Sequence, residues 1–228
     1  MKALSTEVIK LDKSSYSQYN VCNSLGFSEG YAHMDGQPNF NRLYEIAENQ
    51  AGYFTAKQAH GAGFSWERLS YYVTTRRFIR VQRGIYRLVQ FPGSPYEDLF
   101  IAWLRTGPSS VISHESALYI YNLSDVLPGE VHVIMPRTGS RRRSGIRLHT
   151  NRLHPNEVTS REGLPVTTAA RTLIDLAATG LAEEHIRQAV NDALHQGLVG
   201  RDELLSIATQ RGGRAMRIIR NIINREKE

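Results

Sequence analysis

The chain has 228 residues, of which 41% are hydrophobic and 22% are charged, as expected for a globular protein with its own core. Its single cysteine, Cys22, excludes an intramolecular disulfide and a cysteine-based zinc site, and fits a reducing cytoplasm. The sequence has no apolar run of membrane-spanning length and no signal-peptide pattern, so we expect a cytoplasmic protein with no membrane partner.

The first 38 residues differ from the rest of the chain. Ser, Tyr, Asn and Gly are frequent there and no hydrophobic period persists, which predicts a flexible leader over residues 1–38. Met34 is followed by a sequence typical of a translation start, so an over-extended gene start is the alternative interpretation.

Residues 39–91 have the pattern of three short helices followed by a β-hairpin. Apolar residues recur at helical spacing, and a threonine or serine precedes the second and third helices as an N-cap. The expected helices are Phe40–Gln50, Ala56–His60 after Thr55, and Trp66–Arg77 after Ser65. Two alternating runs on either side of Arg83-Gly84 predict the hairpin. This order of elements predicts a winged helix-turn-helix.

Residues 92–228 are expected to form a second domain. Pro95 is well placed at the start of a helix, and strand-like runs follow at 131–135, at 146–149 and around Val158. From Ala170 onward, stripes of apolar residues at helical spacing predict a helical C-terminus. The predicted fold class is therefore α+β, with an N-terminal winged helix-turn-helix followed by a mixed α/β domain that ends in helices.

The third helix of the winged domain is expected to have two different faces. One face should pack on the first two helices through Trp66, Leu69 and Val73. The opposite face should present Arg68, Tyr71 and Thr75 to solvent, with Tyr72 on its flank. A guanidinium, a hydroxyl and aromatic rings in such a position suit base edges and thymine methyls in a DNA groove.

Arginine is concentrated in this domain, within a chain whose formal net charge is +6. Its guanidinium suits phosphate and guanine, so basic residues on the helix and hairpin favour DNA binding. The candidate DNA-binding residues lie on the second and third helices, at their caps, or on the hairpin: Thr55, Lys57, Gln58, Ser65, Arg68, Tyr71, Tyr72, Thr75, Arg76, Arg77, Arg80, Gln82, Arg83 and Arg87. A winged helix used for protein contacts is the alternative.

A second basic stretch lies between two of the expected strands. It contains no acidic residue, and its candidate contact residues are Arg137, Arg141, Arg142 and Arg143. We expect either a solvated loop, a second phosphate contact, or a surface for RNA.

Neither a catalytic site nor a metal site is expected. The run Ser113-His114-Glu115 has residue types used in hydrolysis, but neighbours on a helix point in different directions, and Ser113 is better explained as an N-cap. His132, His149 and His154 could meet in the sheet region, but they lack the close spacing and partner carboxylates of a metal site. We therefore expect a protein that is not an enzyme and that needs no cofactor.

Several short motifs, in their order and spacing, resemble the AbiEi family of antitoxins from type IV (abortive infection) toxin–antitoxin systems. These motifs are Phe54–Ala59, Arg68-Leu69, Val81–Leu88, Ile112–Ala117, Val131–Val133 and Gly163–Leu176. The resemblance implies an autorepressor that binds inverted repeats in double-stranded DNA upstream of its own operon. It also implies an antitoxin that opposes a nucleotidyltransferase-like toxin encoded next door, with no need for a stable complex. The alternative is a protein- or RNA-interaction module that neutralises a toxin by direct contact.

Overall fold

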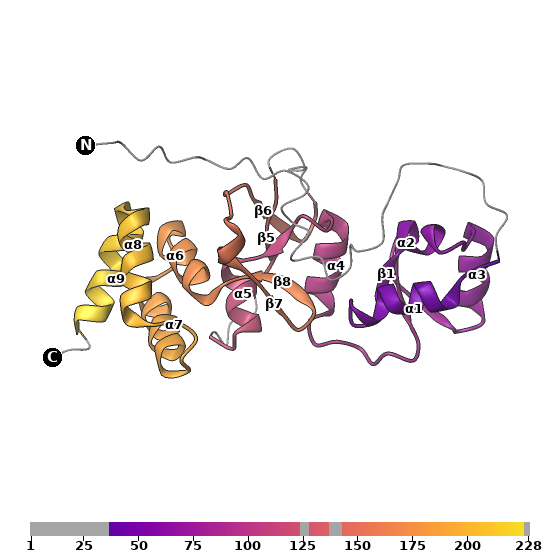
Figure 1. Cartoon of the computed structure of the whole chain (residues 1–228), viewed down its shortest axis with the longest axis horizontal. Helices are drawn as coiled ribbons and strands as arrows, with labels where there is room; N and C mark the ends of the chain where they lie inside the picture. The colour runs from indigo at the N-terminus through magenta and orange to yellow at the C-terminus, as the bar shows by residue number, and fades with distance from the viewer. Residues whose placement is uncertain (1–36, 124–127, 137–142, 226–228) are drawn as a thin grey trace, which may run out of the picture.

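The computed structural model describes residues 37–123, 128–136 and 143–225. Most of the expected leader, with Met34, lies outside these residues, as do Arg137, Arg141 and Arg142 of the second basic stretch. The chain is α+β, as predicted. Along its long axis it places a helix–hairpin unit at one end, a mixed sheet in the middle and a group of helices at the other end (Figure 1).

The N-terminal unit is a winged helix-turn-helix. Its elements are α1 (Phe40–Glu48), β1 (Tyr53–Thr55), α2 (Ala56–Gly61), α3 (Trp66–Thr74), β2 (Phe78–Gln82) and β3 (Ile85–Leu88). The three predicted helices and the hairpin are present, and β1 adds a third strand by pairing antiparallel with β3 in the order β1-β3-β2. Helix α3 ends three residues earlier than predicted, because Arg76 adopts a left-handed φ of 57° that a helix cannot continue through.

The prediction of which α3 residues pack on the first two helices is correct for Leu69 and wrong for Trp66. Leu69 is 1% exposed, whereas Trp66 is 60% exposed and contacts His60 in a T-shaped arrangement, with 4.3 Å between ring centroids. Tyr72 is partly buried and replaces Trp66 in the core, where its ring lies 5.2 Å from Phe40 and makes further contacts with Phe64 and Phe78. Tyr72 is therefore a packing residue and not an exposed one, contrary to expectation.

The second part of the chain is built on a five-stranded mixed sheet of order β6-β5-β4-β8-β7. Its elements are α4 (Glu97–Thr106), β4 (Val111–Ile112), α5 (His114–Ile120), β5 (Val131–Ile134), β6 (Ile146–His149), a short 3-10 helix (Pro155–Glu157), β7 (Val158–Arg161) and β8 (Leu164–Thr167). Three predicted strands are present. The two-residue strand β4 and strand β8, which pair in parallel, were not predicted.

Four helices complete the chain: α6 (Ala169–Thr179), α7 (Glu183–His195), α8 (Arg201–Arg211) and α9 (Gly213–Arg225). Their apolar stripes are buried, as predicted. Helix α6 lies against the other three helices and α5, and even its polar residues Arg171 and Asp175 are buried. None of the helices in the described part of the chain is long and apolar enough to cross a membrane.

A packed junction connects the winged domain to the sheet domain. The ring of Tyr53 in β1 stacks on Phe100 of α4 at 5.3 Å, and its hydroxyl donates to Glu97 Oε2 at 2.7 Å. Burial and this carboxylate raise the pKa of Tyr53 to about 12, so the phenol stays protonated. The guanidinium of Arg87 lies over the same ring, 5.9 Å from its centroid. The junction therefore fixes the orientation of the winged domain through side-chain contacts as well as through the chain itself.

Candidate nucleic-acid interface

Helix α2 is held at its first turn by a capping box. Thr55 Oγ1 accepts from the backbone N–H of Gln58 at 3.1 Å, and Gln58 Oε1 accepts from the backbone N–H of Thr55 at 2.7 Å. The Gln58 amide also donates to Gln50 Oε1 at 3.0 Å. Thr55 and Gln58, both candidate DNA-binding residues, therefore position α2, while Lys57 next to them is exposed.

Helix α3 is held by its cap and by one buried side chain. Ser65 Oγ accepts from the backbone N–H of Arg68 at 3.3 Å, and Leu69 enters the core. With Leu69 directed inward, the 100° rotation per residue turns Arg68, Tyr71 and Thr75 outward. All three are exposed, as predicted, and Tyr71 is 61% exposed.

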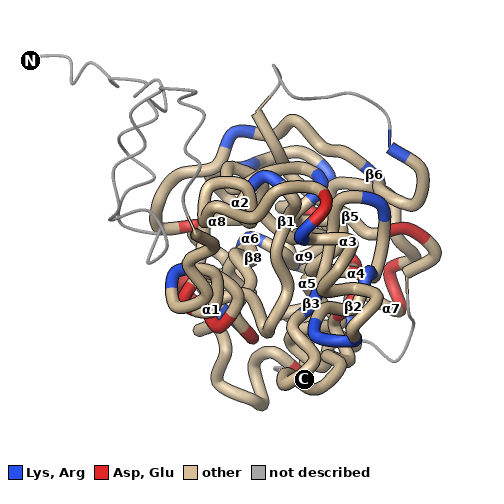
Figure 2. The backbone as a smooth tube through the Cα atoms, turned by 90° about the vertical axis from the view of Figure 1, so that its right-hand side faces the viewer, with Lys and Arg blue, Asp and Glu red and all other residues tan. Residues whose placement is uncertain are grey.

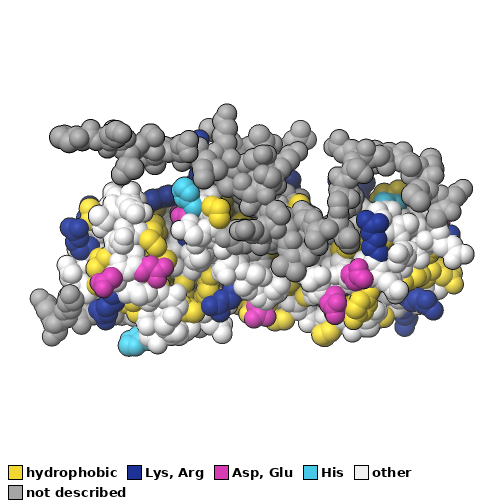
Figure 3. All heavy atoms as spheres, viewed as in Figure 1, with side chains coloured by type: hydrophobic (Ala, Val, Ile, Leu, Met, Phe, Trp, Pro, Cys, Tyr) yellow, Lys and Arg dark blue, Asp and Glu magenta, His cyan; other side chains and the backbone are white. Residues whose placement is uncertain are grey.

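The exposed face of α3 is larger than the sequence predicted. Trp66 is exposed at its first turn, and the hydroxyl-bearing residues Ser70 and Thr74 lie on its outer surface. Trp66 and Tyr71 are 60% and 61% exposed on this face, and Figure 3 shows hydrophobic side chains next to basic ones at this end of the molecule. The sequence feature that could have predicted the exposure of Trp66 is its position directly after the capping serine. A side chain at the first position of the helix lies outside the region where α3 contacts the core.

The hairpin between β2 and β3 forms a short wing. Gly84 adopts a φ of 78°, which a tight turn of this kind requires, and Arg83 beside it is exposed. A register shift between Arg80 and Gln82 bends β2, and both side chains are exposed. Figure 2 looks onto this end of the molecule and shows Lys and Arg segments next to β2 and β3.

The remaining predicted residues divide between the exposed face and the junction. Arg76 and Arg77 follow α3 and are exposed, with the Arg77 guanidinium 5.9 Å from the Tyr72 ring centroid. Arg87 is half-buried, donates to the Phe91 carbonyl, and contacts Tyr53 at the domain junction. Arg87 therefore lies on a strand of the wing, as expected, but its side chain is directed to the domain junction.

The electrostatics of residues 39–91 differ from those of the rest of the chain. This segment holds eight Lys and Arg residues against three Glu residues, a formal net charge of +5 out of +6 for the whole protein. The solvent face of α3, the turn after it and the wing together carry six arginines that the structure leaves exposed or partly exposed: Arg68, Arg76, Arg77, Arg80, Arg83 and, toward the junction, Arg87. Such a surface can contact the phosphates of a nucleic acid.

The predicted histidine set is rearranged in the structure. His154 is exposed at the start of the 3-10 helix, and His114 lies beside His132 and His149 in its place. Ser113 and His114 do contact each other, with 3.0 Å between Oγ and Nδ1, although adjacent residues were expected to point apart. Both are at most 1% exposed.

Comparison with known proteins identifies relatives of both parts. A family model described as a transcriptional regulator, AbiEi antitoxin, matches residues 41–89, and one described as the AbiEi antitoxin C-terminal domain matches residues 110–224. A crystal structure of the RV2827C protein from Mycobacterium tuberculosis is similar over 81% of this chain and 75% of that one, with 14% identity and a TM-score of 0.50. That likeness shows a shared fold. No curated protein matches significantly.

Proposed function

The chain belongs to the AbiEi family of antitoxins and transcriptional regulators, and on that premise we propose that its winged domain binds operator DNA and represses its own operon. The observation that carries the proposal is the composition of the outer face of α3. Arg68, Tyr71 and Thr75 project from a helix whose opposite side is anchored by Leu69. An ordinary solvent face would show mainly Glu, Lys and Gln in place of an exposed tyrosine.

In this proposal α3 enters the major groove and the wing contacts the backbone. Arg68 is able to reach two acceptors on a guanine edge, while Tyr71 and Thr75 supply a ring and a hydroxyl for neighbouring bases. Arg80 and Arg83 lie where phosphates would pass, and they set affinity more than sequence preference. Inverted repeats in the operator would be bound by two copies of the chain, one on each half-site.

Competition binding tests the assignment of base contacts to α3. The full chain is titrated with a duplex from upstream of its own operon in the presence of random duplex. Arg68→Ala or Thr75→Ala should reduce the preference for the upstream duplex, by about 1–3 kcal/mol for Arg68. Arg220→Ala is the matched control, because Arg220 is exposed on α9 at the other end of the molecule. An unchanged preference in both α3 variants would contradict the proposal.

A second proposal concerns the kind of toxin that this antitoxin opposes. Membership of an antitoxin family supports a partner toxin, and we propose that it is nucleotidyltransferase-like and encoded next to this chain, as the sequence resemblance implies. Co-expression of this chain with the neighbouring toxin gene should restore the growth that the toxin alone prevents. Arg68→Ala should still protect when expression is driven from a foreign promoter, since repression and antitoxicity then depend on different surfaces. Loss of protection in this variant would place both activities on the winged domain.

Direct neutralisation is the alternative to an antitoxin that acts without a stable complex. Arg143 at the end of the second basic stretch is partly buried, and the rest of that stretch lies outside the described residues. Co-purification distinguishes the two, because direct neutralisation predicts a stoichiometric complex between this chain and the toxin, whereas the proposal predicts none.

A further inference from the structure

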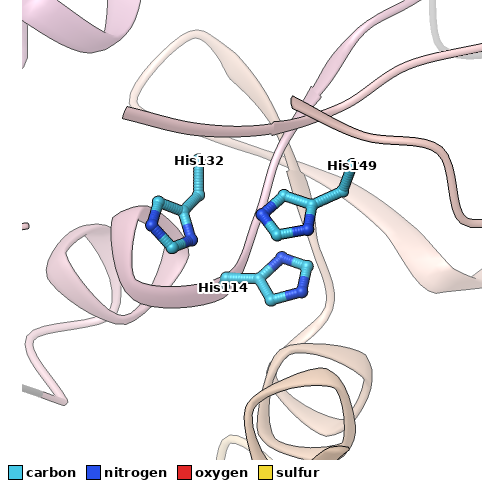
Figure 4. Close-up of side chains that lie close together, drawn as sticks. All are labelled: His114, His132 and His149. Carbon is cyan, nitrogen blue, oxygen red and sulfur yellow. The ribbon is translucent and has the colours of Figure 1, made fainter. Parts of the chain in front are cut away.

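Three histidines from separate elements of the sheet domain lie close together. His114 begins α5 directly after β4, His132 lies on β5, and His149 ends β6. One ring nitrogen of each lies within 4.8 Å of one ring nitrogen of the others, and Figure 4 shows the His132 ring to one side of the stacked His114 and His149 rings.

The topology explains why these three meet. Strands β5 and β6 are parallel, with His132 opposite Arg147 and Ile134 opposite His149, so both histidines lie on the same face of the sheet. His114 reaches the same face because its backbone adopts a φ of 52° at the point where β4 turns into α5. A non-glycine residue in that conformation is uncommon and is associated with functional positions.

Each of the three rings has a nitrogen without a partner. His114 Nε2, His132 Nδ1 and His149 Nε2 are buried and have no hydrogen-bond partner within the part of the chain that the structure describes. His114 and His132 are only 1% and 6% exposed. Buried polar atoms are nearly always paired, so three unpaired nitrogens in one cluster require an explanation. A metal ion would occupy all three lone pairs at once.

The charge state of the cluster fits a cation ligand set. Burial, then His149 and His132, then the positive charges of Arg171 and Arg147, lower the pKa of His114 to about 3. Burial and the charge of Arg147 lower the pKa of His132 to about 4, and burial, His132 and Arg147 lower the pKa of His149 to about 4. The rings are therefore neutral at physiological pH, the state in which imidazole binds metals. Two arginines act on these rings: Arg171 is paired with Glu157 at 2.7 Å and Asp175 at 2.8 Å, and Arg147, opposite His132 in the sheet, is exposed to solvent.

We propose that His114, His132 and His149 bind one divalent transition-metal ion of the Zn²⁺ class, each through one ring nitrogen. Zn–N bonds of about 2.1 Å in tetrahedral geometry place the nitrogens about 3.4 Å apart, so nitrogens that are up to 4.8 Å apart have to close by about 1.4 Å. The His114 and His149 rings, which stack with their centroids 3.7 Å apart, have to rotate out of this parallel arrangement to bind one ion. Three protein ligands leave the fourth position to water. His149, the one partly exposed ring of the three, provides the entry path.

Ser113 has a positioning role in this site. Its Oγ lies 3.0 Å from His114 Nδ1, and in the tautomer with the proton on Nδ1 this N–H donates to the hydroxyl and leaves Nε2 as the ligand atom. Removing such a contact weakens metal binding by about 10- to 100-fold. Ser113→Ala should therefore retain the stoichiometry of binding and lose affinity in that range.

Calorimetric titration of the tag-free, chelator-treated full chain with Zn²⁺ tests the proposal. We expect one ion per chain and a higher melting temperature on binding. His132→Asn and His149→Gln should each abolish stoichiometric binding. His154→Asn is the matched control, because His154 is exposed and close in sequence, and it should bind as the unchanged protein does. No binding by the unchanged protein, or full binding in both ligand variants, would overturn the proposal.

A measurement on the unchanged protein covers the case in which the variants fail to fold. X-ray absorption at the zinc edge of the loaded full chain should show about three imidazole nitrogens at roughly 2.0–2.1 Å. A first shell of oxygen ligands alone would place the ion elsewhere and overturn the assignment.

Discussion

Replacing Arg171 with methionine should destabilise the sheet domain in a pH-dependent way. Arg171 is 3% exposed and its guanidinium contacts Asp175, which is 1% exposed, and Glu157, which is 21% exposed. In Arg171→Met, Glu157 can turn to water, but Asp175 keeps only the more distant Arg211, at 3.4 Å. Burial already raises the pKa of Asp175 against the guanidiniums that lower it, so losing the nearer one leaves a costly buried charge.

Two estimates of the loss in unfolding free energy for Arg171→Met agree. Removing one partner of a buried ion pair costs about 3–5 kcal/mol. The carboxyl can escape by taking up a proton, which at pH 7 costs about 4 kcal/mol, from roughly three pH units at 1.36 kcal/mol each. We therefore expect a loss of about 3–4 kcal/mol at pH 7.

The pH dependence has a definite sign. The folded-state pKa of Asp175 already lies above its unfolded value, and losing the Arg171 guanidinium raises it further in the variant. As pH falls, folding of the variant is therefore favoured more than folding of the unchanged protein, and the deficit shrinks. At pH 5 protonation costs only about 1.5 kcal/mol, and the loss should fall to about 1–2 kcal/mol.

Urea denaturation at both pH values measures the difference in the free energy of unfolding. Arg187→Met is the control, since Arg187 pairs with Glu184 at the surface and should change stability by less than about 0.5 kcal/mol. A loss in Arg171→Met below about 1 kcal/mol at pH 7, or an equal loss at both pH values, would refute this reasoning.

Two further changes test the packing of the winged domain. Leu69→Ala should lower the free energy of unfolding of the winged domain by about 2–5 kcal/mol, because the side chain is fully buried where α3 meets the core. If thermal denaturation gave an unfolding free energy within about 1 kcal/mol of that of the unchanged protein, α3 would be anchored elsewhere. Gly52→Ala should cost about 2 kcal/mol or more, since φ is 88° and the new Cβ would lie 2.4 Å from Phe91 Cβ; a neutral effect in the same assay would mean that this turn can rearrange.

The winged domain was predictable because its signals are local. Thr55 and Ser65 cap their helices as expected, and Gly84 marks the hairpin turn. The failures at Trp66 and Tyr72 come from one cause. Both lie within about 60° of Leu69 on a helical projection, on opposite sides, and only the position of α1 and β2 decides which ring is covered.

The histidine cluster could not be assembled from sequence, because it depends on non-local pairing. His132 and His149 were recognised as candidates, but their third partner was taken to be His154, which is close to His149 in sequence. His114 joins them only through the pairing of the two-residue strand β4 with β5 and the left-handed backbone that follows β4. A strand of two residues gives no periodicity to detect.

The proposal that the winged domain binds operator DNA is tested most directly by the salt dependence of that binding. The logarithm of the association constant of the full chain for its upstream duplex should fall linearly with the logarithm of salt concentration. The double variant Arg80→Ala/Arg83→Ala should bind more weakly with a slope shallower by about 1 to 2, whereas Arg220→Ala should match the unchanged protein. A slope that is the same in all three proteins, or an upstream duplex bound no better than random DNA, would contradict the account.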